Sequence, residues 1–298
     1  MPSLTAKAIA VMIGLSGSKR IGGSAEATLA QVAALQIRPE SWAPPTKLSK
    51  RVGFSVRTVK GWPVYTVTPR CAATRRRALY SHGGTWFHQI RSVHWNLIAK
   101  LAASTGTQFT VPVYPLVPAG TAATVVPAIA DMVAEQVAEV GAGNVTIIGD
   151  SAGGTITLAV AMLLRDRALP APHRTILISP ALDLAFTDPA IARISPSDPW
   201  MAAAALRAVA QLWRGELPID DPLVSPLHGD LSGLAPITLF SGTRDIINAD
   251  ARSLVRKAAA ADFPLDYHEG PELLHVYPLL PIPEADEARV VMEKALKD

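Results

Sequence analysis

The stretch that decides the fold is Gly149–Gly154, GDSAGG, a G-x-S-x-G pattern with one further glycine. It follows a β-branched run, Asn144–Ile148, and precedes an amphipathic segment, Ala152–Arg165, so it lies where a strand turns into a helix. At such a junction the serine sits on a tight, strained turn, and glycines avoid collisions with neighbouring backbone. The start of the helix places its amides and the positive end of its dipole beside the serine. The pattern therefore predicts that Ser151 is a nucleophile.

Strands and helices alternate along most of the chain around this turn. Parallel pairing follows from that order, because a crossover is needed to return to the same edge of the sheet. The sequence therefore predicts an α/β fold with a mostly parallel central sheet and helices on both faces. The predicted strands are Ala78–Ser81, Gln108–Val113, Asn144–Ile148, Thr175–Ile178, Ile237–Phe240 and Leu265–His268. The predicted helices are Phe87–Ser104, Pro127–Val140, Ala152–Arg165, 249–261 and 285–297.

A hairpin and a cap complete the expected organisation. Phe54–Val59 and Val64–Val67 are β-rich, and the connector 60–63 contains Gly61 and Pro63, so an antiparallel hairpin is predicted. A long insertion separates the strand that ends near residue 178 from the one that begins at 237. Insertions at that end of a parallel sheet are typical of a lid. We therefore expect one domain, residues 1–298, with a helical cap formed by 1–50 and about 185–220.

Composition excludes several classes of protein. The chain has 298 residues, 49% of them hydrophobic, and a net charge of only +3. Its basic run, Arg75–Arg77, is isolated, and without a basic stripe or stacking motif we expect no nucleic-acid binding. Cys71 is the single cysteine, so no intramolecular disulfide can form, and a small apolar filler is the expected role.

The N-terminal region contains an apolar run, Ala8–Leu15. A membrane span needs about 20 such residues, and the features of a signal peptide are missing. We therefore expect no stable membrane span and a cytoplasmic location. An amphipathic helix is predicted instead, covering its own core, a lipid surface or a partner subunit, which leaves a homodimer open.

A second motif, His82–Trp86 (HGGTW), follows the predicted strand Ala78–Ser81. Glycines let the backbone bend so that the amides of Gly83 and Gly84 point at the same place as the amide of Ala152. Three such donors form an oxyanion hole for acyl transfer. His82 is expected to hold this loop by hydrogen bonds rather than to act as a base.

The two motifs together resemble the hormone-sensitive-lipase-like family of microbial esterases. Asp221–Leu227 and Ser241–Asp245 are similar to two further segments of that family. The resemblance runs from about residue 75 to the C-terminus and covers residues 1–50 weakly. It implies an α/β-hydrolase fold with a helical cap, no cofactor or metal, and hydrolysis of carboxylic esters through an acyl-enzyme. The family motifs fall on Ser151 as nucleophile, Asp245 as acid, His275 as base, and Gly83, Gly84 and Ala152 as oxyanion donors.

The order of residues supports this triad independently. Triads on this fold run serine, acid, histidine, and Ser151, Asp245 and His275 obey that order. Asp245 follows the predicted strand Ile237–Phe240, so it should lie at the carboxyl edge of the sheet, where ligand sites form. His275 lies in a loop after the last strand and can reach both partners.

Other candidates exist for the acid and the base. Asp183 precedes the insertion, and Asp250 is expected to begin a helix. His268 is the other histidine that follows Asp245, but it ends a predicted strand and is expected to be packed or solvated. Asp245 and His275 are favoured over all three.

The chain departs from the family pattern in two places. Thr85 replaces a third glycine, which makes esters of bulky tertiary alcohols poorer substrates. Val113–Pro118 matches the family's segment only loosely, so the acyl or alcohol pocket is expected to have a different shape there.

The predicted function is that of a serine carboxylesterase acting on small-molecule esters with short- to medium-chain acyl groups. Trp86, in the glycine loop, and Trp200, in the insertion, are candidates for substrate binding, with a core aromatic as the alternative for each. An amidase, lactonase or deacetylase would use the same triad, because the motif does not specify the leaving group. A non-catalytic binding protein is the alternative from another class, disfavoured because all three triad residues are present.

Overall fold

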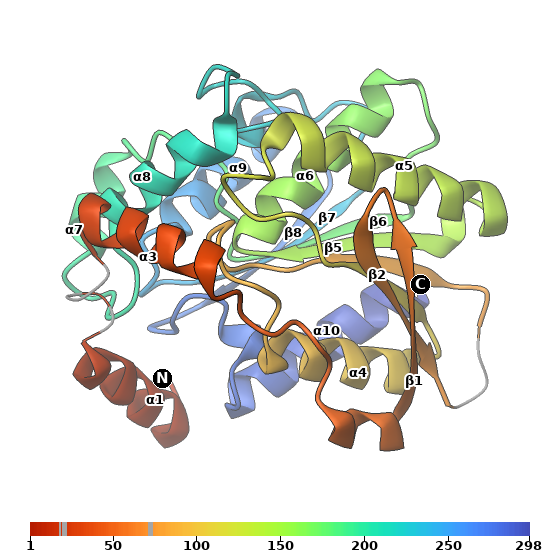
Figure 1. Cartoon of the computed structure of the whole chain (residues 1–298), viewed down its shortest axis with the longest axis horizontal. Coiled ribbons are helices and arrows are strands. Elements are labelled where there is room, and N and C mark those ends of the chain that lie inside the picture. Colours follow the sequence, from red (N-terminus) through yellow and green to blue (C-terminus); the bar gives the residue numbers. More distant parts are fainter. Residues whose placement is uncertain (18, 20–22, 71–73) are drawn as a thin grey trace.

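A single twisted sheet forms the centre of the molecule, with helices on both faces (Figure 1). The computed structural model describes residues 1–17, 19, 23–70 and 74–298, and Cys71 lies outside these. Within them, eight strands have the order β1-β2-β4-β3-β5-β6-β7-β8. The pairs of β2 with β1 and with β4 are antiparallel, and the remaining pairs are parallel. The predicted fold class is therefore confirmed.

The strands are β1 (Val52–Val59), β2 (Trp62–Pro69), β3 (Arg77–Ser81), β4 (Gln108–Pro112), β5 (Val145–Asp150), β6 (Arg174–Ile178), β7 (Ile237–Gly242) and β8 (Leu265–Gly270). The longer helices are α1 (Leu4–Ser16), α3 (Ala25–Ile37), α4 (Ser92–Thr105), α5 (Ala122–Val140), α6 (Ala152–Asp166), α8 (Ala203–Arg214), α9 (Asn248–Ala260) and α10 (Pro283–Lys297). A short helix, α7 (Pro189–Ile194), lies in the insertion between β6 and β7.

Two apolar layers sandwich the sheet. Helices α5 and α6 pack on one face, and α9 extends that layer with Ala251 and Leu254 against Leu158 of α6. Helices α4 and α10 pack on the opposite face, with Trp95 and Met292 in its core. Every residue of β5 and β7 is buried, as expected for central strands covered on both sides. The carboxyl ends of β3, β5 and β7 then bring their loops to one edge of the sheet.

Several element boundaries differ from those predicted. The hairpin turn is tighter, since only Lys60 and Gly61 lie outside the strands, both with positive φ, and β2 begins at Trp62. Helix α4 begins at Ser92 instead of Phe87, because the preceding residues form the glycine loop. Helix α5 begins at Ala122, so Pro127 lies inside the helix instead of in its first turn.

The N-terminal helices occupy different places. Helix α3 packs against α8 from the insertion, and the two lie side by side in Figure 1. Helix α1 lies apart, tied to the start of α10 by the hydroxyl of Ser3, which donates to Glu284 at 3.0 Å.

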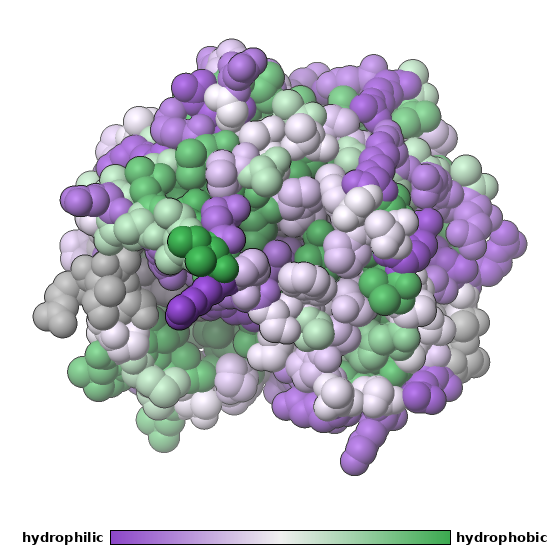
Figure 2. Space-filling view, in the orientation of Figure 1, coloured by the Kyte–Doolittle hydropathy of each residue, from purple (hydrophilic) through white to green (hydrophobic). Residues whose placement is uncertain are grey.

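Helix α1 was expected to cover an apolar surface, but it buries only small residues, Ala6 and Ala10. Four of its large apolar side chains are exposed and contribute to an apolar region at lower left in Figure 2; they are Leu4, Val11, Met12 and Leu15. Among the described residues, no helix is both long enough and apolar enough to cross a membrane.

Candidate active site

Ser151 stands between β5 and α6 in a backbone conformation that few residues adopt. Its φ is 52° and its ψ is −121°, the strained turn expected of an exposed nucleophile. The glycines beside it have no room for a side chain. A Cβ on Gly149 would lie 2.2 Å from the carbonyl oxygen of Gly153, and one on Gly153 would lie 2.0 Å from that of Ser81. Gly149 is therefore required for close packing of β5 on α6, and Gly153 for close packing of α6 on β3.

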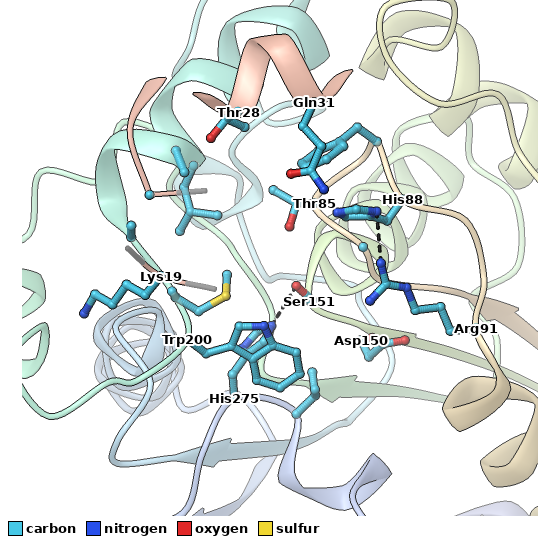
Figure 3. Close-up of a pocket in the computed structure, with 18 of the residues that line it drawn as sticks. Lys19, Thr28, Gln31, Thr85, His88, Arg91, Asp150, Ser151, Trp200 and His275 are labelled. Carbon is cyan, nitrogen blue, oxygen red and sulfur yellow. Dashed lines mark hydrogen bonds between the residues drawn. The ribbon is translucent and has the colours of Figure 1, made fainter. Parts of the chain in front are cut away.

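Ser151 and His275, shown in Figure 3, come together with Asp245 at the carboxyl edge of the sheet. The Nε2 atom of His275 lies 3.0 Å from the Oγ of Ser151, and its Nδ1 lies 2.8 Å from Oδ2 of Asp245. The exposed fraction is 6% for Ser151, 5% for His275 and 0% for Asp245. Three segments far apart in the sequence thus bring a hydroxyl, an imidazole and a carboxylate into one hydrogen-bonded line.

The loop carrying His275 is fixed by its neighbours. The amide of Val276 donates to the Oγ of Ser179 at 3.0 Å, and Oδ1 of Asp245 accepts the amide of Ile247 at 3.1 Å. Burial alone lowers the pKa of His275, but the charge of Asp245 and its hydrogen bond outweigh burial and raise that pKa. The imidazole is therefore held in one orientation, with Nε2 toward Ser151.

The rival acids are occupied elsewhere. Asp250 lies in the first turn of α9, and its carboxylate accepts the amides of Leu182 and Asp183 at 2.7 and 3.1 Å. Burial raises the pKa of Asp250 to about 7. Asp183 lies 3.5 Å from the imidazole of His228.

The rival base is also placed away from the serine. His268 is stacked on Phe240, and its Nε2 lies 2.8 Å from Asp266. None of Asp183, Asp250 and His268 is joined to Ser151 by a hydrogen bond among the described residues.

The amides of the glycine loop that can act as oxyanion donors differ by one residue from those predicted. The amide of Gly83 donates to Oδ1 of Asp150 at 3.0 Å, so it is not available as an oxyanion donor. Gly84 and Thr85 line the cavity beside Ser151, and no hydrogen bond within the described residues uses their amides. The amides that face the cavity are therefore one residue further along the chain than predicted. Gly84 and Thr85 both have positive φ, 123° and 53°, which turns this part of the loop away from Asp150.

A buried polar cluster supports the loop from below. Asp150 accepts the hydroxyl of Tyr80 at 2.7 Å and lies 3.3 Å from Nε2 of His94. Burial alone raises the pKa of Asp150, but the His94 charge and the hydrogen bonds outweigh it and lower that pKa.

His82 lies at the other end of the same loop. Its Nδ1 donates to the carbonyl of Gly83 at 2.6 Å, and its ring is stacked on Tyr114. Burial, with the nearby His94 charge, lowers the pKa of His82 to about 4, so it is neutral. It makes no hydrogen bond to Ser151 and takes part in shaping the loop, as expected.

A cavity of about 920 Å³ opens over Ser151. Helix α3 contributes Thr28 and Gln31 on one side, and Trp200 lies on the other side against His275 (Figure 3). Apolar residues of the insertion and of the loop after His275 complete the wall, namely Met201, Leu206, Val276 and Leu279.

Trp200 lines this cavity, but Trp86 does not. Trp86 is fully buried in the core and stacked on Trp213 of α8, with ring centroids 5.8 Å apart. The prediction that Trp86 binds substrate is therefore corrected in favour of its alternative, a core aromatic. Its position after Thr85, whose backbone faces the cavity, turns the indole inward.

Glu40 ties the chain after α3 to the glycine loop. Its carboxylate accepts the amide of Gln89 at 2.9 Å and pairs with Arg91 at 3.0 Å and His88 at 3.1 Å.

Among the described residues, no group of three His, Cys, Asp or Glu side chains is arranged to hold a metal ion.

Sequence reasoning missed one buried acid near the triad. Asp198 is 2% exposed, and its Oδ2 accepts the amide of Ile246 at 2.9 Å. The signal was weak: an aspartate before Pro199 in a proline-rich insertion reads as a turn.

Comparisons with known proteins agree with this geometry. A family model described as the alpha/beta hydrolase fold matches residues 78–279. A triacylglycerol lipase of Mycobacterium tuberculosis is 35% identical over 254 residues, 83% of this chain and 53% of its own, so the chain spans about half of that relative. An acetyl-hydrolase of Streptomyces hygroscopicus is 32% identical over 214 residues, covering 69% of this chain and 71% of its own.

A solved structure shares the fold over almost the whole chain. It is a hormone-sensitive-lipase homologue from a metagenome library, with a TM-score of 0.83 and 21% identity, covering 99% of this chain and 98% of its own. Together with the matched family model, these likenesses confirm the resemblance seen in the two glycine motifs. The chain therefore belongs to the α/β-hydrolase family.

Proposed function

We propose that this protein is a carboxylic ester hydrolase that works through an acyl-enzyme on Ser151. The observation that carries the proposal is the hydrogen-bonded line from Ser151 Oγ to His275 Nε2, 3.0 Å, and from His275 Nδ1 to Asp245 Oδ2, 2.8 Å. A serine, a base and an orienting acid in this geometry are what nucleophilic acyl transfer requires. The names of the relatives, a triacylglycerol lipase and an acetyl-hydrolase, support the same class of substrate.

The reaction proceeds in two halves. His275 takes the proton of Ser151 as the oxygen attacks the ester carbonyl, and Asp245 keeps Nδ1 protonated and stabilises the imidazolium. His275 then gives that proton to the departing alcohol, which leaves an acyl group on Ser151. A water molecule, deprotonated by the same imidazole, releases the acid and restores the serine.

The oxyanion is stabilised by the amides of Gly84, Thr85 and Ala152. Ala152 is the first residue of α6, so its amide has no partner within the helix. Thr85 takes the place that the sequence prediction gave to Gly83, whose amide is bound to Asp150. Loss of one such donor raises the barrier by about 2.7–4 kcal/mol.

The cavity supports short- to medium-chain acyl groups as substrates. Its volume of about 920 Å³ is large enough for a small ester, and the wall beside His275 is apolar. Residues 1–50 and 185–220 act as the cap in this proposal, because α3 and the insertion both line the cavity. The cytoplasmic location and the homodimer stay predictions.

Hydrolysis of p-nitrophenyl esters, from acetyl to long acyl chains, tests the proposal with wild type and Ser151→Ala side by side. We expect wild-type turnover that the substitution abolishes, and covalent labelling of Ser151 by a serine-directed phosphonate. The chain-length optimum measures the acyl pocket. Folded wild-type protein with no turnover on any ester would overturn the proposal and favour an amide, a lactone or a binding role.

A further inference from the structure

A buried carboxylate outside the triad joins the insertion to the turn that carries the triad acid. Asp198 precedes α8, and its Oδ1 accepts the backbone amides of Trp200 and Met201 at 2.8 and 3.0 Å. Its Oδ2 accepts the amide of Ile246, the residue after Asp245, at 2.9 Å. Three backbone amides from two distant segments therefore share one carboxylate.

Both segments held by Asp198 contact the catalytic imidazole. Trp200 lies edge-on against His275, with ring centroids 5.9 Å apart and an angle of 85° between the planes. Asp245 contacts the same ring at Nδ1, 2.8 Å from its Oδ2. His275 is thus enclosed by two neighbours whose backbone positions depend on Asp198.

Two of the described cations near Asp198 bond to backbone carbonyls instead of to its carboxylate. Lys19 donates to the backbone carbonyl of Asp198 at 2.7 Å, and Arg244 donates to the carbonyl of Ser197 at 3.0 Å. Burial and the adjacent charge of Asp245 raise the pKa of Asp198.

The charge of Asp198 reaches the imidazole. Burial lowers the pKa of His275, while Asp245 first, then Asp198 and Asp150, raise it. Asp198 is therefore a second source of negative potential at the ring, beyond the acid that hydrogen-bonds to it.

We propose that Asp198 is a positioning residue that locks the insertion to the acid turn and stabilises the protonated form of His275 during acyl transfer. The inference rests on the proposed function, because it concerns the same proton. That proton moves from Ser151 Oγ to His275 Nε2, and the positive charge formed on the ring then faces both Asp245 and Asp198. In the same step the insertion, through Trp200, keeps the ring aligned with the serine.

The test is the pH dependence of kcat/KM on p-nitrophenyl butyrate for wild type, Asp198→Asn and Asp198→Glu. Asparagine removes the charge, and only one of its two terminal atoms can accept a hydrogen bond, so it cannot hold the amides of both segments. We expect the acidic midpoint of Asp198→Asn to fall by about 0.5–1 pH unit and kcat to fall about tenfold. Glutamate keeps the charge, but its longer side chain moves the carboxylate away from the amides that Asp198 binds. Its midpoint should therefore match that of wild type while its kcat falls.

Asp188→Asn is the matched control within the same insertion. Asp188 caps α7, where its carboxylate accepts the amide of Ala190 at 2.7 Å, and it makes no contact with the triad. Its midpoint and kcat should equal those of wild type. A midpoint does not depend on a folded fraction that is constant over the pH range, so partial unfolding of that kind does not disguise the result.

An unchanged midpoint in Asp198→Asn, with wild type active and Ser151→Ala inactive, would overturn this inference and leave the proposed function standing. Absence of turnover in folded wild type would overturn the proposed function itself. If Asp198→Asn does not fold, Asp198→Glu decides, since a shifted midpoint or an unaltered kcat in that variant contradicts the proposal.

Discussion

Asp150 accepts the backbone amide of Gly83 at 3.0 Å, so the residue before the nucleophile anchors the loop that faces it. The aspartate of GDSAGG thereby connects β5 to the end of β3. A Cβ on Gly83 would lie 2.3 Å from Oδ2 of Asp150, which shows how closely the two segments pack. The serine elbow and the glycine loop are consequently one structural unit.

Asp150→Ala should lower both stability and activity. It leaves the Tyr80 hydroxyl, His94 and the Gly83 amide without their buried partner, and breaking a buried pair in this way costs about 3–5 kcal/mol. Urea denaturation measures that loss, and the ester assay measures the fall in kcat. Asp166→Ala is the control, because Asp166 is 58% exposed and its pair with Arg165 lies at the surface. Equal stability of the two variants would contradict the anchoring role.

The pH profile of kcat/KM should have an acidic limb with its midpoint above 6.5. Burial lowers the pKa of His275, but Asp245 raises it above that ordinary value. Because only the neutral imidazole can take the serine proton, activity should fall as the pH drops through this raised pKa. A midpoint below 6.5 would mean that burial outweighs the carboxylate.

Gly153→Ala should prevent the elbow from closing. The added Cβ would lie 2.0 Å from the carbonyl oxygen of Ser81 and 2.6 Å from that of His82, so the backbone must move, at a cost of about 3 kcal/mol or more. Denaturant midpoints and phosphonate labelling measure the effect. Gly143→Ala is the control, since nothing lies within 4 Å of a Cβ there. Normal labelling of Gly153→Ala would contradict the close packing of the elbow.

The two tryptophans should respond differently to truncation. Trp86→Ala removes a buried indole from the core and should destabilise the fold by about 3–5 kcal/mol. Trp200→Ala should instead raise KM for the longer acyl esters by about tenfold, equivalent to about 1.4 kcal/mol of binding. It should also lower kcat for every ester, because the indole packs against His275. Thermal unfolding and a chain-length series separate the two effects. A KM change in Trp86→Ala without loss of stability would restore it as a substrate-binding residue.

Thr85→Gly should widen the range of alcohols accepted. Thr85 lines the cavity and has a positive φ of 53°, so glycine relieves strain and removes a side chain beside the serine. We expect faster hydrolysis of tert-butyl esters relative to primary-alcohol esters. Ala168→Gly relieves a similar φ of 53° after α6, away from the cavity, and should leave that ratio unchanged. The same ratio in both variants would rule out the steric role of Thr85.

The core of the fold could be predicted because its signals are local. Strand β5 carries a β-branched run, Val145–Ile148, and the glycines that follow this run permit a tight turn. The start of α5 was missed because Pro127 suggested a first turn, although the amide of Thr121 donates to the Thr124 hydroxyl and closes an earlier cap.

Long-range contacts explain what the sequence could not predict in the site. Consecutive amides in the glycine loop point in different directions, and the φ values of Gly84 and Thr85 decide which amides face the cavity. The amide of Gly83 is taken by a residue 67 positions away. Asp198 likewise bonds Ile246, 48 positions along the chain, and nothing near either residue indicates that contact.

The pairing of α3 with α8 has a consequence for how such a protein can diversify. The serine, the acid and the base stand on loops of the sheet, whereas much of the cavity wall comes from an N-terminal helix and an insertion that carry none of them. Mutation of the wall can therefore alter which molecules are admitted while the chemistry is inherited intact. A directed-evolution library confined to α3 and residues 201–206 should yield new selectivities with little loss of turnover. Asp198 should be left out of the library, because it holds the insertion to the turn that carries the triad acid.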